Sequence, residues 1–389
     1  MKRVSIITSY YPPETGAASN RIYHLAEGLK DQEIDVSIIT PMPNYPHGKI
    51  FKGYRGKFKI RTNENGITIN RLWVFASNSK NKLLRLWAML SYSLSLSWFF
   101  IFNKLPEVVI IQSPPLLVSF TCLFLLKSKK RTVVLNVSDL WPLAGLELRA
   151  FKRGFAYSLL ERIEAYNYKT ADFIMGQSDE ILSHIRVIQE KPAFLYRNYP
   201  DLELVTSSPI QDSERIKLVY AGLLGIAQGI LKLCQEIDYS GIELHIYGQG
   251  AEKSEIETFI SNNPELPIYY HGEIRRSELI KIIGTYDLAL IPLLNRIYGS
   301  VPSKIFELGL LGLPVLYFGG GEGEKIVAEH GLGWTAEAGN YEVLNRVLRG
   351  ITKADLSMEK RHEIRATAKE QFNFKSQLER LMERLNDLV

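Results

Sequence analysis

The sequence predicts an α/β protein built from two doubly wound, Rossmann-like domains that face a central cleft. Strand-like and helix-like segments alternate along both halves of the 389-residue chain, which is typical of parallel sheets covered by helices on both faces. A polar segment at residues 198–213, which contains Pro200 and Pro209, separates the halves. A chain of this length also suffices for two hydrophobic cores.

The first half is expected to begin with a strand at residues 3–8, a loop rich in Pro and Gly at 10–18 and a helix at 19–30. Helices are expected between the strands that follow, at residues 36–40, 67–75, 108–112, 132–137 and 173–176.

The second half repeats the pattern. Strands are expected at residues 217–221, 242–247, 268–270, 288–291 and 315–318, and helices at 226–237, 252–261, 277–284 and 303–312. Two charged helices, at 358–372 and 375–388, are expected to pack back across both domains. We thus expect domains at 1–200 and 209–372, with a helix at about 373–389 returning to the first.

Composition and charge narrow the function classes. The chain is 46% apolar and 23% charged, which is ordinary for a globular protein. Its two cysteines lack metal-ligand spacing and indicate a reducing compartment. The apolar run at residues 1–8 is too short for a signal peptide, so a cytoplasmic protein is expected.

Positive charge is concentrated in the first half. Residues 1–200 carry 27 Lys and Arg against 15 Asp and Glu, whereas the remainder carries 20 against 27. An anionic partner is therefore expected for the first half, either nucleic acid or an anionic membrane surface. No nucleic-acid motif accompanies the charge, so the membrane is favoured and nucleic acid is not expected.

Residues 86–102 form an uncharged run of 17 residues that allows two interpretations. The run is shorter than the roughly 20 residues of a spanning helix. Its alternating serines are strand-like, but its length without Gly or Pro favours a helix. It is either a buried core helix or an element lying in the plane of a membrane. The second interpretation uses aromatic anchors and flanking bases: Trp87, Trp98, Phe99, Lys80, Lys82, Arg85 and Lys104.

Residues 299–316 are the most informative segment. Pro302 suits the first turn of a helix, where free amides and the helix dipole favour an anion. Ser303 and Lys304 lie in that turn, and Glu307 follows on the same face as Lys304. A hydroxyl, a cation and free amides suit a diphosphate, and the carboxylate suits sugar hydroxyls. The alternative is an ordinary capped helix with a salt bridge.

Three further loops follow predicted strands, at residues 11–21, 220–229 and 247–252. Small residues such as Gly16 and Gly222 let the backbone approach a ligand closely. The first loop lacks the Gly-x-Gly-x-x-Gly spacing, which argues against a dehydrogenase. Each loop alone resembles a plain strand-to-helix turn, but all three together with the 302–307 segment predict a nucleotide-diphosphate site.

On these residues the chain resembles the GT-B-fold glycosyltransferases of the large retaining family four, over essentially its full length. Three motifs look most like a bacterial subgroup that transfers N-acetylated amino sugars of the fucosamine type to lipid-linked precursors of surface polysaccharides such as O-antigen or capsule. They are Pro-Asn-Tyr-Pro-His-Gly at 43–48, Asp-Leu-Trp-Pro at 139–142 and Val-Pro-Ser-Lys at 301–304.

The resemblance implies a UDP-linked sugar donor, a polyprenyl-diphosphate-linked saccharide acceptor and transfer with retention at the inner face of the plasma membrane. No Asp-x-Asp motif follows a strand, so transfer without a metal or other cofactor is expected. The implied donor-binding residues are Gly16, Arg197, Gly222, Gly225, Gln228, Gly248, Ser303, Lys304 and Glu307. The implied acceptor-binding residues are Asn44, Tyr45 and His47.

Asp139 is the expected acceptor-side base or positioning group. From the sequence alone a helix N-cap is the stronger interpretation, and the resemblance favours the functional one. His47 and His24 are weaker candidates for this role, and His24 is expected to be structural.

Two positions depart from the family pattern. The first of two glutamates in the family's E-x7-E spacing would fall at Gly299, and a basic residue of the glycine-rich loop is replaced by Gln228. Two alternative functions stay open: a nucleotide-sugar 2-epimerase of the same architecture, and a non-catalytic partner of a polysaccharide assembly complex. The epimerase would place several carboxylates and histidines in the cleft, and Gly299 favours the non-catalytic alternative.

Overall fold

The computed structural model describes residues 1–79, 81–148, 152–201 and 213–388. It separates into two compact units, each described by itself below. Unit 1 comprises Met1–Asn198, Ile297–Gly299 and Phe374–Val389, and unit 2 comprises Tyr199–Arg296 and Ser300–Asn373. Most of the expected segment at 198–213, and the flanking Lys80, lie outside the described residues.

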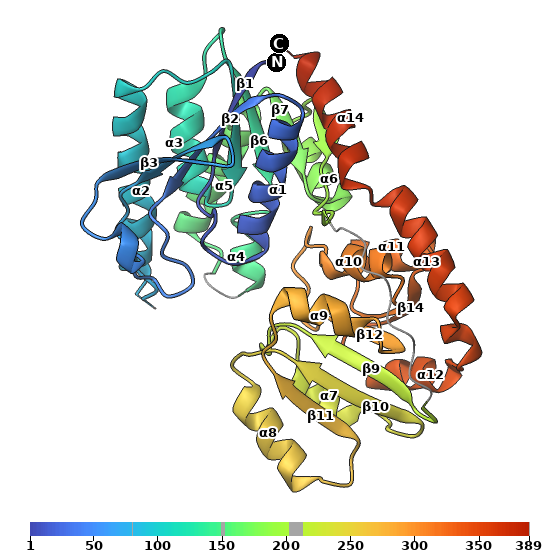
Figure 1. Cartoon of the computed structure of the whole chain (residues 1–389). Helices are drawn as coiled ribbons and strands as arrows, with labels where there is room; N and C mark the ends of the chain where they lie inside the picture. Colours follow the sequence, from blue (N-terminus) through green and yellow to red (C-terminus); the bar gives the residue numbers. More distant parts are fainter. Residues whose placement is uncertain (80, 149–151, 202–212, 389) are drawn as a thin grey trace. The chain divides into compact units, whose positions relative to one another are not determined.

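Unit 1 is built on an eight-stranded sheet with the strand order β3-β4-β2-β1-β5-β6-β7-β8 (Figure 1). All neighbouring pairs are parallel except β3 with β4. The strands are β1 Arg3–Ile7, β2 Asp35–Pro41, β3 Lys59–Glu64, β4 Ile67–Leu72, β5 Val108–Ser113, β6 Thr132–Val137, β7 Phe173–Gly176 and β8 Ala193–Leu195.

Helices pack on both faces of this sheet. One face is covered through a core that includes Tyr92, Cys122, Tyr168 and Ile181, which come from α2, α3, α5 and α6. Helix α1 contributes Ile22, Leu25 and Leu29 to buried positions, and α14 packs against it. The helices are α1 Ala17–Asp31, α2 Lys82–Phe102, α3 Leu116–Leu126, α4 Leu143–Glu147, α5 Phe155–Thr170, α6 Asp179–Ile188 and α14 Phe374–Asn386, with a 3₁₀ turn at Lys52–Tyr54.

Unit 2 is built on a six-stranded parallel sheet with the order β11-β10-β9-β12-β13-β14. Its central strands are continuous apolar runs, as expected for strands buried on both faces. The strands are β9 Ile216–Ala221, β10 Ile242–Tyr247, β11 Ile268–Gly272, β12 Leu288–Pro292, β13 Val315–Phe318 and β14 Gly333–Ala336.

Two separate cores lie on the two faces of the unit 2 sheet. One contains Leu233, Ile256 and Leu344 from α7, α8 and α12, and the other contains Ile283, Ile305, Ile326 and Ile364 from α9, α10, α11 and α13. The helices are α7 Ile230–Glu236, α8 Lys253–Asn262, α9 Arg276–Ile283, α10 Lys304–Leu311, α11 Glu322–Glu329, α12 Tyr341–Gly350 and α13 Met358–Gln371, with a 3₁₀ turn at Ala354–Leu356.

The α/β class with two doubly wound sheets is therefore confirmed, with four local corrections. The strand predicted at 67–75 ends at Leu72, and strands β3, β8 and β14 were not predicted. The helix predicted at 226–237 begins only at Ile230, because the glycine-rich segment before it forms a turn that ends at Gly229 with φ 63°. The sheet of unit 1 is not wholly parallel, since β3 is an antiparallel edge strand.

Residues 86–102 belong to α2, so the helix expected there is confirmed. Ser91, Ser93 and Ser95 of this helix are buried. Ser95 Oγ donates to the carbonyl of Trp73, and Ser91 Oγ accepts from the amide of Phe75. Within the described residues, no helix combines the length and the apolarity that crossing a membrane requires.

Candidate functional site

The topology of unit 2 marks one ligand-binding position. Successive strands are added on one side of β9 up to β11 and on its other side from β12 onward, so the strand order reverses between β9 and β12. Ligands of open α/β sheets bind outside the carboxyl ends of the strands at such a switch point. The loop after β9 is the predicted glycine-rich loop. The segment after β12 leads to α10, which carries Lys304 and Glu307 near its start.

Backbone hydrogen bonds join the glycine-rich loop to the loop after β10. The amide of Gly222 donates to the carbonyl of Tyr247 at 2.9 Å, and the amide of Leu224 donates to that of Gln249 at 2.9 Å. Gly248 has φ 146°, and a β-carbon there would collide with the carbonyl oxygen of Gly222. Two of the three loops predicted from the sequence thus form one layer of close-packed backbone in which Gly248 cannot be replaced without a shift.

Lys304 is the cation of this site. Its Nζ lies 5.4 Å from the centre of the Tyr220 ring and close to Gly222, where a β-carbon would be only 2.6 Å from Nζ. Burial lowers the pKa of Lys304 to about 8, and the charge of Glu307 opposes that shift. Ser303 occupies the N-cap of α10 without a side-chain bond to the helix. The arrangement therefore offers a partly desolvated ammonium beside the start of a helix, as an anion requires.

Glu307 lies one turn further along α10 and has a partner that the sequence did not reveal. Its Oε1 accepts hydrogen bonds from Arg276 at Nε (3.0 Å) and pairs with Nη2 (2.8 Å). Arg276 begins α9, and its side chain is 47% exposed, compared with 24% for Glu307. Arg276 can therefore orient the carboxylate while remaining accessible itself.

Gln228 and Gly225 shape the turn between β9 and α7. The amide of Gln228 donates to the carbonyl of Gly225 at 3.0 Å, and a β-carbon at position 225 would lie 2.8 Å from Gln228 Oε1. Gln228 Oε1 is buried and has no hydrogen-bond partner among the residues that the structure describes. The amide of Ile230 at the start of α7 donates to Glu252 Oε2 at 2.9 Å, so Glu252 fixes the end of this turn.

In unit 1, Glu14 organises the predicted acceptor loop. Its Oε1 accepts hydrogen bonds from the amides of Asn44 (2.7 Å) and Tyr45 (2.8 Å), and the residue is only 3% exposed. Burial raises the pKa of Glu14, and these two hydrogen bonds oppose the increase. Gly16 precedes α1 with φ 146°, and its β-carbon position lies 3.7 Å from the Tyr45 ring. His47 is exposed at the end of this loop.

Asp139 follows β6, and the helix after it begins at Leu143 with Pro142 as N-cap. Asp139 is therefore not the helix cap that the sequence also allowed. Burial raises its pKa, whereas the charge of Arg21 and a hydrogen bond from Ser138 lower it. Arg21, from α1, is 6% exposed and donates to Gln177 Oε1, but its Nε and Nη2 have no hydrogen-bond partner within the described part of the chain. No role for Arg21 was predicted from the sequence.

Three other residues named from the sequence also lie in unit 1. The Gly299 amide donates to Glu180 Oε2 at 2.9 Å, and its carbonyl accepts from Ser178 Oγ at 2.7 Å. Arg197 pairs with Asp179 at 3.0 Å, and its amide donates to Gln377 Oε1. His24 makes ring contacts with Tyr23 and Phe374, consistent with a structural role.

Comparison with known proteins finds sequence similarity to glycosyltransferases. Residues 16–193 match the family model described as a glycosyl transferase 4-like domain. The probable glycosyltransferase WbjE of Pseudomonas aeruginosa is 25% identical over 242 residues, which is 58% of this chain and 60% of the relative. The chain thus matches about 60% of that relative's length.

Solved structures extend the likeness to the whole chain. Sucrose-phosphate synthase from Thermosynechococcus elongatus superposes with a TM-score of 0.76 at 13% identity, covering 100% of this chain and 99% of that one. HepE of Anabaena in complex with UDP and glucose gives 0.69 at 14% identity, with both chains fully covered. The likeness to these structures shows a GT-B-like fold, and residues 16–193 are similar to a glycosyl transferase 4-like domain.

Proposed function

We propose that this protein transfers an N-acetylated amino sugar from a UDP-linked donor to a polyprenyl-diphosphate-linked saccharide, with retention, in bacterial surface-polysaccharide synthesis. The observation that carries the proposal is Lys304, a partly desolvated ammonium held against Gly222 at the switch point of unit 2. HepE, of the same fold, was solved with UDP and glucose, and WbjE is a probable glycosyltransferase, which supports a nucleotide-sugar donor.

The reaction needs no metal ion in this proposal. The bond between C1 of the sugar and the diphosphate oxygen breaks, and a bond from an acceptor hydroxyl to C1 forms. The ammonium of Lys304 and the backbone amides of the Gly222 and Ser303 segments stabilise the charge that develops on the departing diphosphate. The hydroxyl proton passes to the leaving phosphate while Asp139 positions the acceptor, or it passes instead to Asp139 acting as the base.

Glu307 binds the ribose hydroxyls in this proposal, and Arg276 orients it. Gly225, Gln228 and Gly248 shape the backbone around the diphosphate in this proposal, and the family resemblance alone adds Gly16 and Arg197 to the donor-binding residues. On the acceptor side, Asn44, Tyr45 and His47 bind the saccharide on a loop that Glu14 fixes.

Calorimetric titration with UDP and GDP, in the presence of a chelator, tests the donor assignment. UDP is expected to bind, and Lys304→Met and Glu307→Ala are each expected to weaken it by roughly 10- to 100-fold, because each removes a charged hydrogen-bonding group. The exposed lysine variant Lys369→Met is the matched control in unit 2 and should bind as wild type. Binding of GDP but not UDP would mean that the donor is a GDP-linked sugar. Binding of neither nucleotide would favour the non-catalytic alternative.

Unit 1 is proposed to dock on the anionic inner face of the plasma membrane. Helix α2 exposes large apolar side chains to solvent: Leu83, Trp87, Leu94, Trp98, Ile101 and Phe102. Lys59 contacts the Phe99 ring of this helix, and Lys104 follows its end; both lysines are exposed. An apolar patch beside such basic residues is typical of membrane-surface elements. Sedimentation with anionic liposomes at low salt tests the proposal, and an absence of binding there would remove the membrane from the proposed function.

A further inference from the structure

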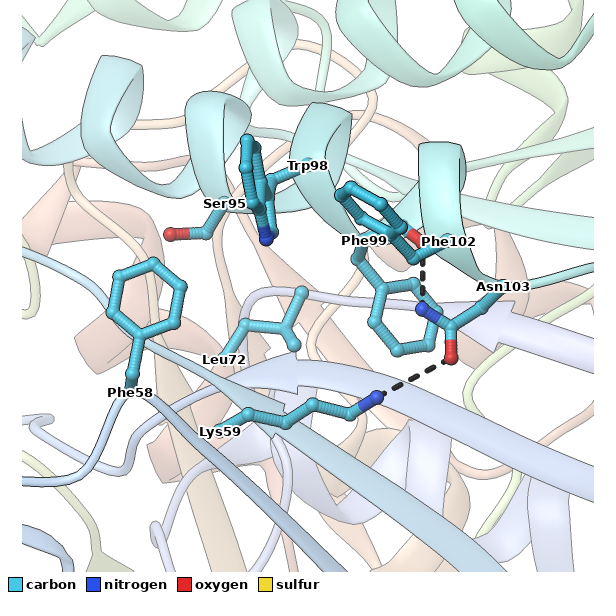
Figure 2. A pocket seen from close by; sticks show the side chains of 8 residues that line it. All are labelled: Phe58, Lys59, Leu72, Ser95, Trp98, Phe99, Phe102 and Asn103. Carbon is cyan, nitrogen blue, oxygen red and sulfur yellow. Dashed lines mark hydrogen bonds between the residues drawn. The ribbon is translucent and has the colours of Figure 1, made fainter.

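A pocket opens between α2 and the β3–β4 hairpin of unit 1, away from the proposed donor-binding and acceptor-binding residues. Two of its lining residues, Trp98 and Phe102, also belong to the exposed apolar patch of α2. Figure 2 shows side chains from both elements converging on it, and its volume is about 160 Å³. The lining residues are Phe58, Lys59, Leu72, Ser95, Trp98, Phe99, Phe102 and Asn103. An engineered apolar cavity of about 150 Å³ binds benzene, so this pocket can hold a group of about that size.

The walls of the pocket are mainly aromatic and are held in place by defined contacts. Phe58 stacks on Trp73 at 6.3 Å, and the rings of Trp98 and Phe102 lie 4.9 Å apart. Leu72 and Phe99 are buried beneath them. The hydroxyl of Ser95 is satisfied because it donates to the carbonyl of Trp73 at 2.7 Å. The interior therefore favours an apolar group and leaves no unmet polar group in the floor.

One end of the pocket is positively charged. Lys59 Nζ lies 4.6 Å from the centre of the Phe99 ring and 3.3 Å from Asn103 Oδ1, and the side chain is exposed (Figure 2). Among the described residues, no carboxylate lies within ion-pair distance of it. Asn103 is itself anchored by a hydrogen bond to the carbonyl of Phe99 at 2.8 Å. A ligand with an apolar body and an anionic end matches this arrangement.

We propose that this pocket binds one end of an isoprenyl chain, with the attached phosphate or diphosphate at Lys59. The inference rests on the proposed function, in which the acceptor saccharide is carried on a polyprenyl diphosphate. The pocket would hold the isoprene unit nearest the diphosphate and so retain the lipid carrier at unit 1.

Shape favours an isoprenyl chain over the fatty-acyl chain of a phospholipid. The pocket volume of about 160 Å³ is close to that of one compact group such as a five-carbon branched unit, and it is too small to enclose a long straight chain. Flat aromatic walls also contact the planar, methyl-substituted double bond of an isoprene unit over a large area. The exposed rings of Trp98 and Phe102 then lie where the rest of the chain leaves the pocket.

The test is calorimetric titration of the full chain with farnesyl diphosphate, kept below its micelle concentration and without membranes. Saturable binding of one farnesyl diphosphate per chain is expected, at least about 100-fold tighter than inorganic diphosphate, because about five carbons are buried. Dodecyl phosphate, with a straight chain, is expected to bind at least about tenfold more weakly than farnesyl diphosphate.

Variants at exposed positions locate the site without threatening the fold. Phe58→Ser and Phe102→Ser remove walls and are each expected to weaken farnesyl diphosphate binding about tenfold or more. Ile101→Ser is the matched control, because Ile101 is 71% exposed on the same helix and lies outside the pocket. Lys59→Met should remove the preference for farnesyl diphosphate over farnesol, whereas Lys104→Met, at an exposed lysine outside the pocket, should keep it.

Four results would overturn the proposal. They are no binding of farnesyl diphosphate, equal binding of inorganic diphosphate, equal binding of dodecyl phosphate, and equal losses from Ile101→Ser and Phe102→Ser. The last would indicate unspecific adsorption to the apolar face of α2. The UDP titration tests the proposed function separately. If UDP binds and farnesyl diphosphate does not, only the proposal for this pocket is rejected. If farnesyl diphosphate binds and UDP does not, the donor assignment is rejected.

Discussion

Lys304 and Gly222 are 82 positions apart in the chain, yet the ammonium of one lies against the backbone of the other. A β-carbon at position 222 would approach Lys304 Nζ to 2.6 Å and the Tyr220 hydroxyl to 2.8 Å. The glycine therefore leaves the space that Lys304 occupies. The contact also joins the strand-end loop to the helix start, the two features that the sequence predicted separately.

Replacing Gly222 by alanine should weaken UDP binding more than it weakens the fold. The new methyl group meets the flexible end of Lys304 rather than backbone, so the lysine is displaced at small cost to stability. We expect a loss of roughly tenfold or more in UDP affinity and a change in unfolding free energy of under about 1 kcal/mol. Gly284→Ala is the control, since its β-carbon would meet open space. Calorimetry measures the UDP affinity, and thermal unfolding measures the change in stability. An unchanged UDP affinity would contradict the proposed diphosphate site beside Lys304.

UDP binding should depend on pH through Lys304. Burial lowers the pKa of this ammonium to about 8, so the free protein begins to lose the charge above pH 8. UDP affinity is expected to decrease from pH 8 to pH 10, and binding in this range should take up a proton. Calorimetry in buffers of different ionisation enthalpy detects that proton. Lys304→Met should bind weakly and show no such proton uptake.

Lys304 should lower the free energy of unfolding at neutral pH. Its folded-state pKa of about 8 lies below its value of 10.5 in the unfolded chain, so the unfolded state binds more protons between these values. The free energy of unfolding is therefore expected to rise as the pH increases from 8 to about 10.5. Lys304→Met removes the buried charge and should raise the melting temperature at pH 7 while UDP binding is weakened. A lower melting temperature in this variant would show that the lysine is well solvated.

How far the sequence predicts the fold and site depends on whether the decisive contacts are local. Most strands of both sheets follow from local apolar runs, and helix α10 follows from its apolar run, Pro302 and the αL glycine Gly312. Residues 226–229 of the glycine-rich turn were predicted as helix because they adjoin an apolar helical run. Strand β3 was missed since its sequence Lys-Ile-Arg-Thr-Asn-Glu is polar on an exposed edge.

The residues missed at the site act through partners distant in sequence. Arg276 meets Glu307 31 positions away, and Glu14 meets Asn44 30 positions away. No periodicity or motif links these pairs. The contacts of Gly299 could not be predicted from the sequence either, which showed only that the family's glutamate is absent at this position. In the structure it has φ 85°, and a β-carbon would lie 2.8 Å from the Ile181 side chain.

Gly299→Glu is therefore expected to destabilise the protein rather than restore a family-like site. The positive φ and the contact with Ile181 should together lower the unfolding free energy by about 1–3 kcal/mol. Gly299→Ala should produce most of this loss, which shows that the β-carbon and not the carboxylate is responsible. Chemical denaturation of both variants measures it, and a glutamate variant as stable as wild type would contradict the geometry.

Glu14 offers a matched pair of substitutions. Glu14→Ala leaves the amides of Asn44 and Tyr45 without an acceptor in a buried place, which should cost about 1–3 kcal/mol of unfolding free energy. Glu14→Gln keeps an oxygen acceptor and removes a charge that burial disfavours, as its raised pKa indicates. The glutamine variant should therefore match wild type within about 1 kcal/mol at pH 7. Equal losses from both variants would mean that the negative charge itself is needed.

Arg21 should control the protonation of Asp139. Burial raises the pKa of Asp139 and the charge of Arg21 lowers it, although no ion pair within 4.0 Å joins these two described residues. Arg21→Met is expected to raise the pKa of Asp139 further, so the acid limb of the pH–rate profile should move to higher pH. Arg21→Lys retains the charge and should move it less. The rate of UDP release from UDP-N-acetylglucosamine, measured from pH 5 to 9, provides the profile.

UDP affinity is the control for this comparison. Arg21→Met and Arg21→Lys both lie in unit 1, so they should leave the diphosphate site beside Lys304 unchanged. Asp139→Asn has no carboxylate to titrate, so adding Arg21→Met to it should shift nothing. If Arg21→Met still moves the acid limb in the Asp139→Asn background, Asp139 is not the group that titrates. A rate lowered equally at every pH would instead assign Arg21 to holding the loop after β6 in place. Only a shift that depends on Asp139 supports a positioning role for Arg21 toward the acceptor-side base.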